Sequence, residues 1–367
     1  MKKRATLSLA FMISTVSPAA TSAPIDAFDS HVRSGATEMF EATPARPLAL
    51  QSGVFPQLVD HAGLLPGQTF GQRYWYDSEF AVGAAAPVLY HVCGETDVDG
   101  SYFLTDNVLE WAKALGAHVV WLEHRYYGQS QPFADLTTPH LRYLTLNNVL
   151  EDLAGFQGWI ATNQGWTGKW IALGGSYSAT LAALYRQKHP ELVVGALAAS
   201  APMISGVGSA IGSSGDAGGL SSTVITPGAS ERQWAYQSCT EVGYWLAESG
   251  DRGAPLDLPS RALCGQVFAN TPYFDAAAYN RAFDAPFLAP GVGAPSNILF
   301  TEGSEDVWTD IGLAVQTNHS PAITILTIDG GGHHYDLNAA RRGDSQAVQD
   351  ARATFTTLAA KWLNDAL

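Results

Sequence analysis

Ser176 is the residue of this 367-residue chain whose surroundings best suit chemistry. It follows an apolar run over residues 169–173, typical of a buried parallel strand, and precedes an alanine- and leucine-rich stretch over residues 179–186 that favours a helix. A serine at such a turn lies at a sheet edge beside free helix N–H groups, where its hydroxyl could attack a carbonyl. Ser178 stands where the G-x-S-x-G pattern has its second glycine, so an ordinary strand–helix loop is the alternative.

An acid and an imidazole that could activate this serine follow two later apolar runs. Asp306 comes shortly after residues 297–300, and His333 follows residues 323–328 and a turn of three glycines. A serine hydroxyl needs an imidazole to take its proton, and the imidazole needs a carboxylate to hold its tautomer. The chain order of Ser176, Asp306 and His333 is the order of the α/β-hydrolases. These three residues are the predicted catalytic triad.

Neighbouring side chains leave other assignments open. Glu302 or Glu305 could replace Asp306 as the acid that orients the imidazole. His333 and His334 could instead form a surface pair or bind a metal ion. His333 is the preferred base because it directly follows the glycine turn.

The order of the predicted elements is that of a doubly wound, mostly parallel α/β sheet. Because the carboxyl ends of parallel strands meet at one edge, the three candidate residues can converge there. Strands are expected over residues 70–76, 88–92, 118–123, 169–173, 193–200, 297–300 and 323–328, and helices over 107–115, 146–163, 179–186 and 347–363.

The N-terminus has the pattern of an export signal. Residues 2–4 are basic, residues 5–16 are largely apolar and residues 18–23 are mostly small. We therefore expect a signal peptide over residues 1–23 and a secreted protein. The formal net charge of −14 argues against nucleic acid or an anionic membrane as a partner.

The sheet pattern stops after residue 201 and resumes near residue 294. Residues 202–293 begin with a glycine- and serine-rich stretch and continue with irregular helical pieces. We interpret this segment as a short helical cap insertion over the carboxyl edge of the sheet. Residues 24–201 and 294–367 would then form the α/β-hydrolase domain.

Three cysteines in an exported chain predict one disulfide and one free thiol. Cys239 and Cys264 enclose a modest loop and are the favoured pair, which leaves Cys93 free. Three buried reduced thiols are the alternative. Asn318 begins an N-glycosylation sequon.

Taken together, these motifs resemble the prolylcarboxypeptidase family of serine peptidases, which includes dipeptidyl peptidase II and thymus-specific serine protease. The most recognisable internal stretch is Glu-His-Arg-Tyr-Tyr-Gly-Gln-Ser at residues 123–130. The other matching stretches are residues 55–61, 69–74, 174–177, 189–190, 198–202, 236–241, 303–308 and 332–337.

The resemblance implies hydrolysis of peptide bonds on the carboxyl side of proline through an acyl-enzyme, without a metal ion or organic cofactor. It makes Ser176 the nucleophile, Asp306 the acid and His333 the base. The expected partner is a proline-containing peptide. The family also works in lysosomes, so an acidic lysosome- or vacuole-like compartment is an alternative location. Cys239 matches a cysteine that forms a disulfide in the family's cap.

The resemblance also implies the residues around the reacting carbonyl. The Tyr177 N–H would be one donor to the oxyanion, and the turn that contains Gly94 and Glu95 would supply the other. Cys93 intrudes in this turn, where it departs from the family.

For the substrate, the resemblance places Trp308 as an aromatic wall against the proline ring, which suits an apolar ring without an N–H. Tyr244 and Thr180 match other pocket positions with changed residues. Glu95 could bind the α-ammonium group of a substrate.

Several departures leave the substrate preference open. The family usually has Gly-Gly at residues 178–179, proline at Val307 and arginine at Asn338. The cap is also shorter, so exopeptidase and endopeptidase action both remain possible. An esterase or lipase with the same triad, or an inactive binding homologue, are the competing functions. The sequence does not indicate an oligomeric state.

Overall fold

The computed structural model describes residues 50–99, 103, 106–204, 206–211, 219–247, 259–268, 279, 287, 295–314 and 319–365. These residues belong to one compact unit that runs from Ala42 to Leu367. The predicted signal peptide at residues 1–23 and Asn318, the acceptor of the sequon, lie outside the described residues.

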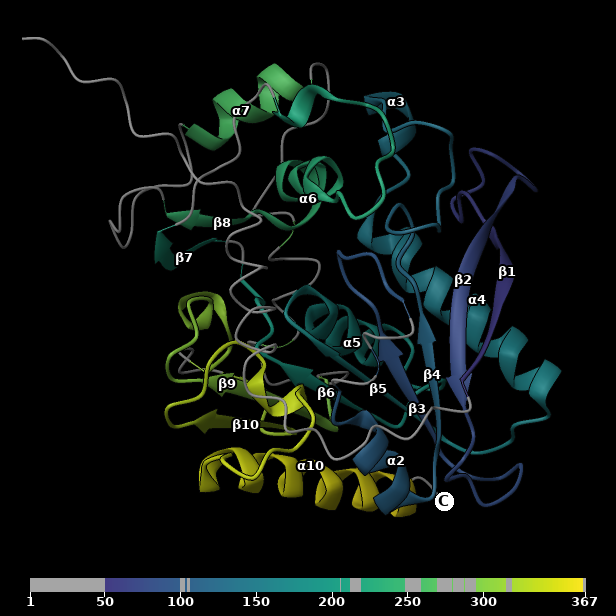
Figure 1. The fold of residues 1–367 in the computed structure, drawn as a ribbon, viewed down its shortest axis with the longest axis vertical. Helices are drawn as coiled ribbons and strands as arrows, with labels where there is room; N and C mark the ends of the chain where they lie inside the picture. Colours follow the sequence, from purple (N-terminus) through teal and green to yellow (C-terminus); the bar gives the residue numbers. More distant parts are fainter. Residues whose placement is uncertain are drawn as a thin grey trace, which may run out of the picture. The chain divides into compact units, whose positions relative to one another are not determined.

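Eight strands form one sheet (Figure 1). They are β1 (Gln51–Leu58), β2 (Thr69–Asp77), β3 (Val88–Val92), β4 (His118–Leu122), β5 (Trp170–Gly175), β6 (Gly195–Ala199), β9 (Ile298–Gly303) and β10 (Ile323–Ile328). Their order is β1-β2-β4-β3-β5-β6-β9-β10. The strands from β4 to β10 are parallel, and the β1–β2 and β2–β4 pairs are antiparallel. This confirms the mostly parallel sheet and adds β1, which the sequence analysis did not predict.

Helices cover both faces of the sheet because buried parallel strands are apolar on both sides. The helices are α2 (Val108–Leu115), α3 (Thr138–Leu141), α4 (Leu146–Gln164), α5 (Tyr177–Lys188) and α10 (Gln346–Asp365). Successive strand residues point to opposite faces. On β3, Leu89 packs with Trp111 of α2 on the face that α10 also covers. The next residue, Tyr90, packs with Phe156 of α4 and Tyr185 of α5.

The helices that flank the site begin and end at identifiable signals. The Thr145 side chain accepts a hydrogen bond from the Asn148 N–H and caps the start of α4. Gly165 and Gly116 end α4 and α2 in the left-handed conformation, at φ values of 68° and 63°, where a glycine carries no Cβ penalty. Together these elements form the α/β-hydrolase architecture that the sequence predicts.

The described part of the predicted cap lies outside this sheet. It contains β7 (Gly206–Ile211), η2 (Gly219–Ser221), α6 (Glu231–Gln237), the π-helical turn η3 (Ser238–Val242), β8 (Tyr244–Ala247) and α7 (Pro259–Val267). Strands β7 and β8 pair in a separate parallel sheet. Cys239 and Cys264 form the predicted disulfide, with their Cα atoms 5.7 Å apart, and Cys93 is free and buried. The boundaries at residues 202 and 293 stay a prediction.

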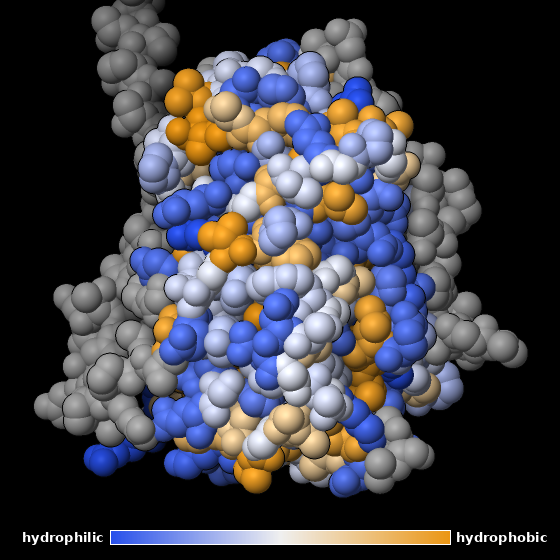
Figure 2. Space-filling view, turned by 90° about the vertical axis from the view of Figure 1, so that its right-hand side faces the viewer, coloured by the Kyte–Doolittle hydropathy of each residue, from blue (hydrophilic) through white to orange (hydrophobic). Residues whose placement is uncertain are grey.

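The surface beside the edge strand β1 and helix α4 mixes polar and apolar residues (Figure 2). Val54 on β1 and Leu64 after it are among the exposed apolar side chains. Among the described helices, none combines the length and the hydrophobicity that crossing a bilayer requires.

Candidate active site

Ser176 occupies the turn between β5 and α5. Its backbone has φ 58° and ψ −132°, a conformation that L side chains rarely adopt. The Ser176 N–H donates to the Ala199 carbonyl at 2.9 Å, and the Ser176 carbonyl accepts from the N–H groups of Ala179 and Thr180. The strained turn is thus held on both sides by backbone hydrogen bonds, as a nucleophile elbow requires.

Small residues around Ser176 are necessary because other side chains pack directly on the turn. A Cβ atom on Gly175 would lie 2.7 Å from Cδ1 of Leu337 and 3.0 Å from Cγ of His334. The Ser178 hydroxyl accepts from the Gly175 N–H at 2.9 Å and donates to the Gly175 carbonyl at 2.7 Å. The serine at the second glycine position of the motif therefore fits and braces the turn.

Asp306 and His333 form a direct contact at the carboxyl edge of the sheet. The Nδ1 atom of His333 lies 2.9 Å from both carboxylate oxygens of Asp306. Burial alone would raise the pKa of Asp306, but the hydrogen bonds and charge of His333, with the Ser200 hydroxyl and the Trp308 N–H, hold that pKa below its ordinary value. Asp306 is therefore an ionised carboxylate that fixes one nitrogen of the imidazole.

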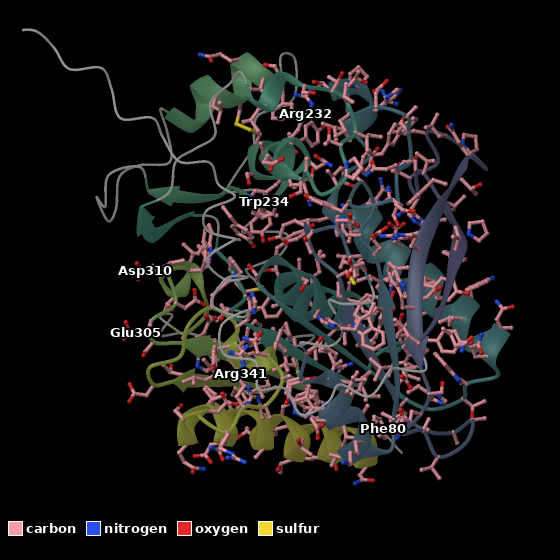
Figure 3. The ribbon with its side chains drawn as sticks, in the orientation of Figure 1. Phe80, Arg232, Trp234, Glu305, Asp310 and Arg341 are labelled. Atoms are coloured by element: carbon pink, nitrogen blue, oxygen red, sulfur yellow. A yellow bond between two sulfur atoms is a disulfide. The ribbon has the colours of Figure 1, made fainter. Side chains whose placement is uncertain are left out.

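The two alternative acids lie in different environments. Glu305 is exposed on the outer rim beyond β9 (Figure 3). Glu302 on β9 is buried, and its pKa is raised well above the ordinary value by burial and by the charges of Asp306 and Asp336. Asp306 contacts His333 directly, so Asp306 is the acid that the geometry favours.

His334 takes a structural position beside the predicted base. Its backbone is left-handed at φ 38°, and its N–H donates to the Ser200 hydroxyl at 2.8 Å. Burial and then the charge of His333 lower the pKa of His334 to about 3, so its ring stays neutral. The ring packs on Gly175 and lies 4.6 Å from the His333 ring. Within the described ranges, no cluster of three or more His, Cys, Asp or Glu side chains could hold a metal ion.

The turn expected to complete the oxyanion site lies against the start of α5. A Cβ atom on Gly94 would lie 3.4 Å from the Ser178 Cβ and 3.6 Å from the Ser178 N–H nitrogen. Glu95 is half-buried, and its charge contributes to a raised pKa of Tyr177, after the larger effect of burial. Cys93 is 1% exposed, and burial raises the pKa of its thiol well above the ordinary value.

The Glu-His-Arg-Tyr-Tyr-Gly-Gln-Ser stretch holds this turn in place. The Arg73 guanidinium binds Glu123 of that stretch through two nitrogens. The same guanidinium donates to Asp97 at 3.2 Å and to the Val98 carbonyl at 2.7 Å, on the loop that continues from the turn at residues 94–95. The Ser130 hydroxyl donates to the Glu123 carboxylate at 2.6 Å. Glu123 of the stretch thus acts through Arg73 to hold the loop that follows the turn at residues 94–95.

The predicted substrate-binding residues have different surroundings. Trp308 is half-buried and packs against the core beside Asp306. Thr180 and Tyr244 are buried, and both hydroxyls donate to the Pro202 carbonyl, at 2.6 Å for Thr180. Substrate contacts of these three side chains stay a prediction.

The structure adds three residues that the sequence analysis did not select. Ser200, at the end of β6, donates to Asp306 and accepts from the His334 N–H. Trp234 lies on α6 (Figure 3), and its ring centroid is 5.4 Å from that of Tyr177. Gln237, also on α6, donates to the Tyr177 hydroxyl at 2.6 Å. Trp234 and Gln237 are three positions apart, so they share one face of a helix, and this spacing is the feature of the sequence that could have pointed to them.

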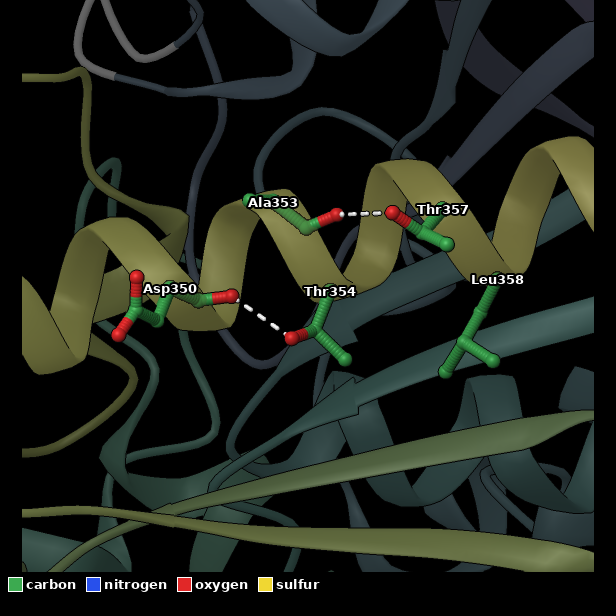
Figure 4. A pocket seen from close by; sticks show the side chains of 5 residues that line it. All are labelled: Asp350, Ala353, Thr354, Thr357 and Leu358. Carbon is green, nitrogen blue, oxygen red and sulfur yellow. Dashed lines mark hydrogen bonds between the residues drawn. The ribbon is translucent and has the colours of Figure 1, made fainter.

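A hollow of about 350 Å³ lies on α10, away from these residues (Figure 4). The hydroxyls of Thr354 and Thr357 inside it donate to the carbonyls of Asp350 and Ala353, at 2.7 and 3.0 Å. These groups are already used within the helix, so we do not assign the hollow a function. It is lined by Asp350, Ala353, Thr354, Thr357 and Leu358.

Known relatives are similar to this chain in one segment of their length. The putative serine protease F56F10.1 of Caenorhabditis elegans is 40% identical over 157 residues, which are 42% of this chain and 29% of that protein. The lysosomal Pro-X carboxypeptidase of Homo sapiens is 39% identical over 160 residues, which are 41% of this chain and 31% of that protein. The matched segments thus span less than a third of these two relatives.

Solved structures that match this chain share little sequence with it. A bacterial heroin esterase has a TM-score of 0.49 and 15% identity, over 92% of this chain and 90% of that one. The esterase LipW from Mycobacterium marinum has a TM-score of 0.47 and 16% identity, over 92% and 88%.

A family model matches most of the chain. Residues 57–210 and 217–355 fit the model described as serine carboxypeptidase S28. This match includes Ser176, Asp306, His333 and most of the described cap elements, and it confirms the peptidase family expected from the motifs. The chain belongs to the serine carboxypeptidase S28 family of serine peptidases.

Proposed function

We propose that this protein is a serine peptidase that hydrolyses peptide bonds on the carboxyl side of proline. The observation that carries the proposal is the contact of His333 with the buried Asp306 carboxylate, at the same sheet edge as the strained Ser176 turn. The S28 family membership and the similarity to the human lysosomal Pro-X carboxypeptidase support a peptide substrate. Export from the cytoplasm is part of this proposal.

The first half of the reaction forms an acyl-enzyme. Asp306 holds the Nδ1 side of His333, which leaves Nε2 to accept the proton of the Ser176 hydroxyl. The Ser176 oxygen then bonds to the carbonyl carbon of the proline residue, and the carbonyl oxygen becomes an oxyanion. The N–H groups of Tyr177 and of the turn at residues 94–95 stabilise that charge. His333 returns its proton to the leaving amine as the peptide bond breaks.

Water completes the reaction in the second half. His333 takes a proton from water, whose oxygen attacks the acyl carbon, and the Ser176 oxygen leaves with the proton held by the imidazole. Trp308 offers the apolar surface beside Asp306 against which a proline ring fits. Glu95 supplies a carboxylate near the oxyanion turn for the ammonium group of a short peptide.

The proposal is tested with a proline-containing chromogenic peptide and a p-nitrophenyl ester, assayed side by side. We expect the wild-type protein to cleave the peptide and to be labelled by a fluorophosphonate. Ser176→Ala should abolish both, whereas Ser222→Ala, at an exposed serine, should change neither. Ester turnover with an untouched peptide would show an esterase instead. No turnover and no labelling would indicate a binding homologue.

The position of the scissile bond is read from fragments. Mass spectrometry of a mixed peptide pool after digestion reports both the residue before the cut and the distance of the cut from each terminus. Cuts after proline near one terminus would establish an exopeptidase, and cuts after proline within long peptides would establish an endopeptidase. Cuts without any proline preference would contradict the proposed specificity.

A further inference from the structure

A buried chain of hydrogen bonds joins the cap to the residue after the nucleophile. The Tyr127 hydroxyl donates to Oε1 of Gln237 at 2.6 Å, and Nε2 of Gln237 donates to the Tyr177 hydroxyl at 2.6 Å. The Tyr177 oxygen lies 3.3 Å from Nε2 of His124, whose Nδ1 lies 2.7 Å from the Arg125 carbonyl. The side chains of Tyr127, Gln237, Tyr177 and His124 are between 0% and 3% exposed.

The positions of the protons in this series of hydrogen bonds follow from the groups at its two ends. A carbonyl can only accept, so Nδ1 of His124 carries the hydrogen and Nε2 presents a lone pair. The Tyr177 hydroxyl accepts from Gln237 and therefore has its own hydrogen available for His124. Burial lowers the pKa of His124 to about 4 and raises the pKa of Tyr177 and Tyr127 well above the ordinary value. Each group thus stays neutral, and all the hydrogen bonds run in one direction.

Two side chains from one face of α6, in the cap, contact Tyr177. Trp234 packs against the Tyr177 ring, and Gln237, three residues later, binds its hydroxyl. The backbone N–H of Tyr177 is the first of α5 after Ser176, where an oxyanion would form. A donor aids catalysis only if it already points at the place where the charge develops.

We propose that Gln237 is a positioning residue for the oxyanion donor Tyr177, so that the cap sets the geometry of the oxyanion site together with the sheet. The inference rests on the proposed peptidase function. Gln237 itself touches no reacting atom. Its effect passes through the Tyr177 ring to the backbone of the first turn of α5.

The test compares two glutamines of the same helix. Gln233 is as buried as Gln237, but its amide donates to the Tyr126 carbonyl at 3.0 Å. Gln237→Leu is expected to lower kcat between about tenfold and about 100-fold with little change in KM, because small displacements at a reacting centre cost that much. Gln233→Leu should keep kcat within about twofold of the wild type.

A transition-state analogue separates positioning from general loosening of the cap. A peptide aldehyde forms a tetrahedral adduct whose oxygen occupies the oxyanion site, whereas a product peptide does not. Gln237→Leu should weaken aldehyde inhibition by the same factor as kcat and leave product inhibition unchanged. Equal effects of Gln237→Leu and Gln233→Leu, or equal weakening of both inhibitors, would overturn the inference.

Tyr177→Phe tests the same link with a smaller change, because it removes one oxygen and keeps the ring beside Trp234. It should reproduce the loss in kcat even if Gln237→Leu fails to fold. The double variant should be no slower than the worse single variant, since both break one chain of bonds. Fully additive losses would contradict the inference. If the wild-type protein shows neither turnover nor fluorophosphonate labelling, the proposed function is overturned as well. If the wild type is active and the Tyr177→Phe variant is fully active, only the inference about Gln237 is overturned.

Discussion

The Nδ1 atom of His333 lies 2.9 Å from each carboxylate oxygen of Asp306, although the two residues are 27 positions apart in the sequence. They meet because Asp306 follows β9 and His333 follows β10, and these strands are parallel neighbours in the sheet. Their carboxyl ends therefore lie at the same edge. Ser176 follows β5, which is parallel to them in the same sheet, so the three predicted triad residues all follow strands that end at one edge.

Asp306→Asn should lower kcat by a factor of about 10³ to 10⁴, because an amide can leave His333 in the wrong tautomer and gives no negative charge to balance the imidazolium. The thermal midpoint should change far less than the activity. Steady-state kinetics with the chromogenic peptide measures the effect, with Glu305→Gln at an exposed carboxylate as the control. A larger loss in Glu302→Gln than in Asp306→Asn would move the acid role to Glu302.

Glu241→Gln should remove a pH dependence of stability. Glu241 accepts from the Leu146 N–H at 2.9 Å, and burial raises its pKa from 4.5 to about 7. Between these values the unfolded chain loses the proton that the folded chain keeps, so the contribution to stability falls as the pH rises from 4.5 to about 7. Thermal midpoints across this range should fall less in Glu241→Gln than in the wild type or in Glu305→Gln. Parallel curves would contradict the raised pKa.

Gly175→Ala should damage both stability and activity. Its Cβ would lie 2.7 Å from Leu337 and 3.0 Å from His334, and such overpacking costs about 1–3 kcal/mol. The displaced His334 adjoins His333, the predicted base, so kcat should fall as well. Urea unfolding and peptide turnover measure the two effects. Gly158→Ala in α4, with nothing within 4 Å, should instead gain about 0.5–1 kcal/mol and keep full activity.

The Cys93 thiol should resist alkylation in the folded protein. It is 1% exposed, and burial raises its pKa well above the ordinary value, so little thiolate is accessible. Iodoacetamide at mildly alkaline pH should leave the mass and the turnover of the folded protein unchanged. In denaturant without reductant it should add one label, because Cys239 and Cys264 are paired. Rapid labelling of the native protein with loss of turnover would show an accessible thiol in the oxyanion turn.

Glu95→Gln should weaken the binding of peptides with a free N-terminus. Loss of a charge-assisted hydrogen bond to an ammonium group should raise KM about tenfold for a short proline peptide. The N-acetylated form of the same peptide has no such charge and serves as the matched substrate control. An equal rise in KM for both peptides would show that Glu95 acts on the oxyanion turn and not on the substrate terminus.

The sequence by itself determined the parts that depend on local pattern. Apolar runs predicted β3 and β10 at the bounds that the structure shows, and the alanine-rich stretch predicted the body of α5. The order of Ser176, Asp306 and His333 followed from motifs that each lie beside their own strand. The Cys239–Cys264 pair followed from cysteine spacing. Such features can be predicted from the sequence because side-chain periodicity, turn chemistry and chain order are properties of neighbouring residues.

The tertiary structure decided what depends on burial and on contacts between distant segments. Strand β1 contains exposed residues and a proline, so its pairing with β2 gave no clear apolar pattern. The choice of Asp306 over Glu302 rests on which carboxyl group lies against His333 in the folded protein. The link from Gln237 to Tyr177 spans 60 residues. Packing alone brings these groups together, because no local pattern records which side chain will lie across from another after folding.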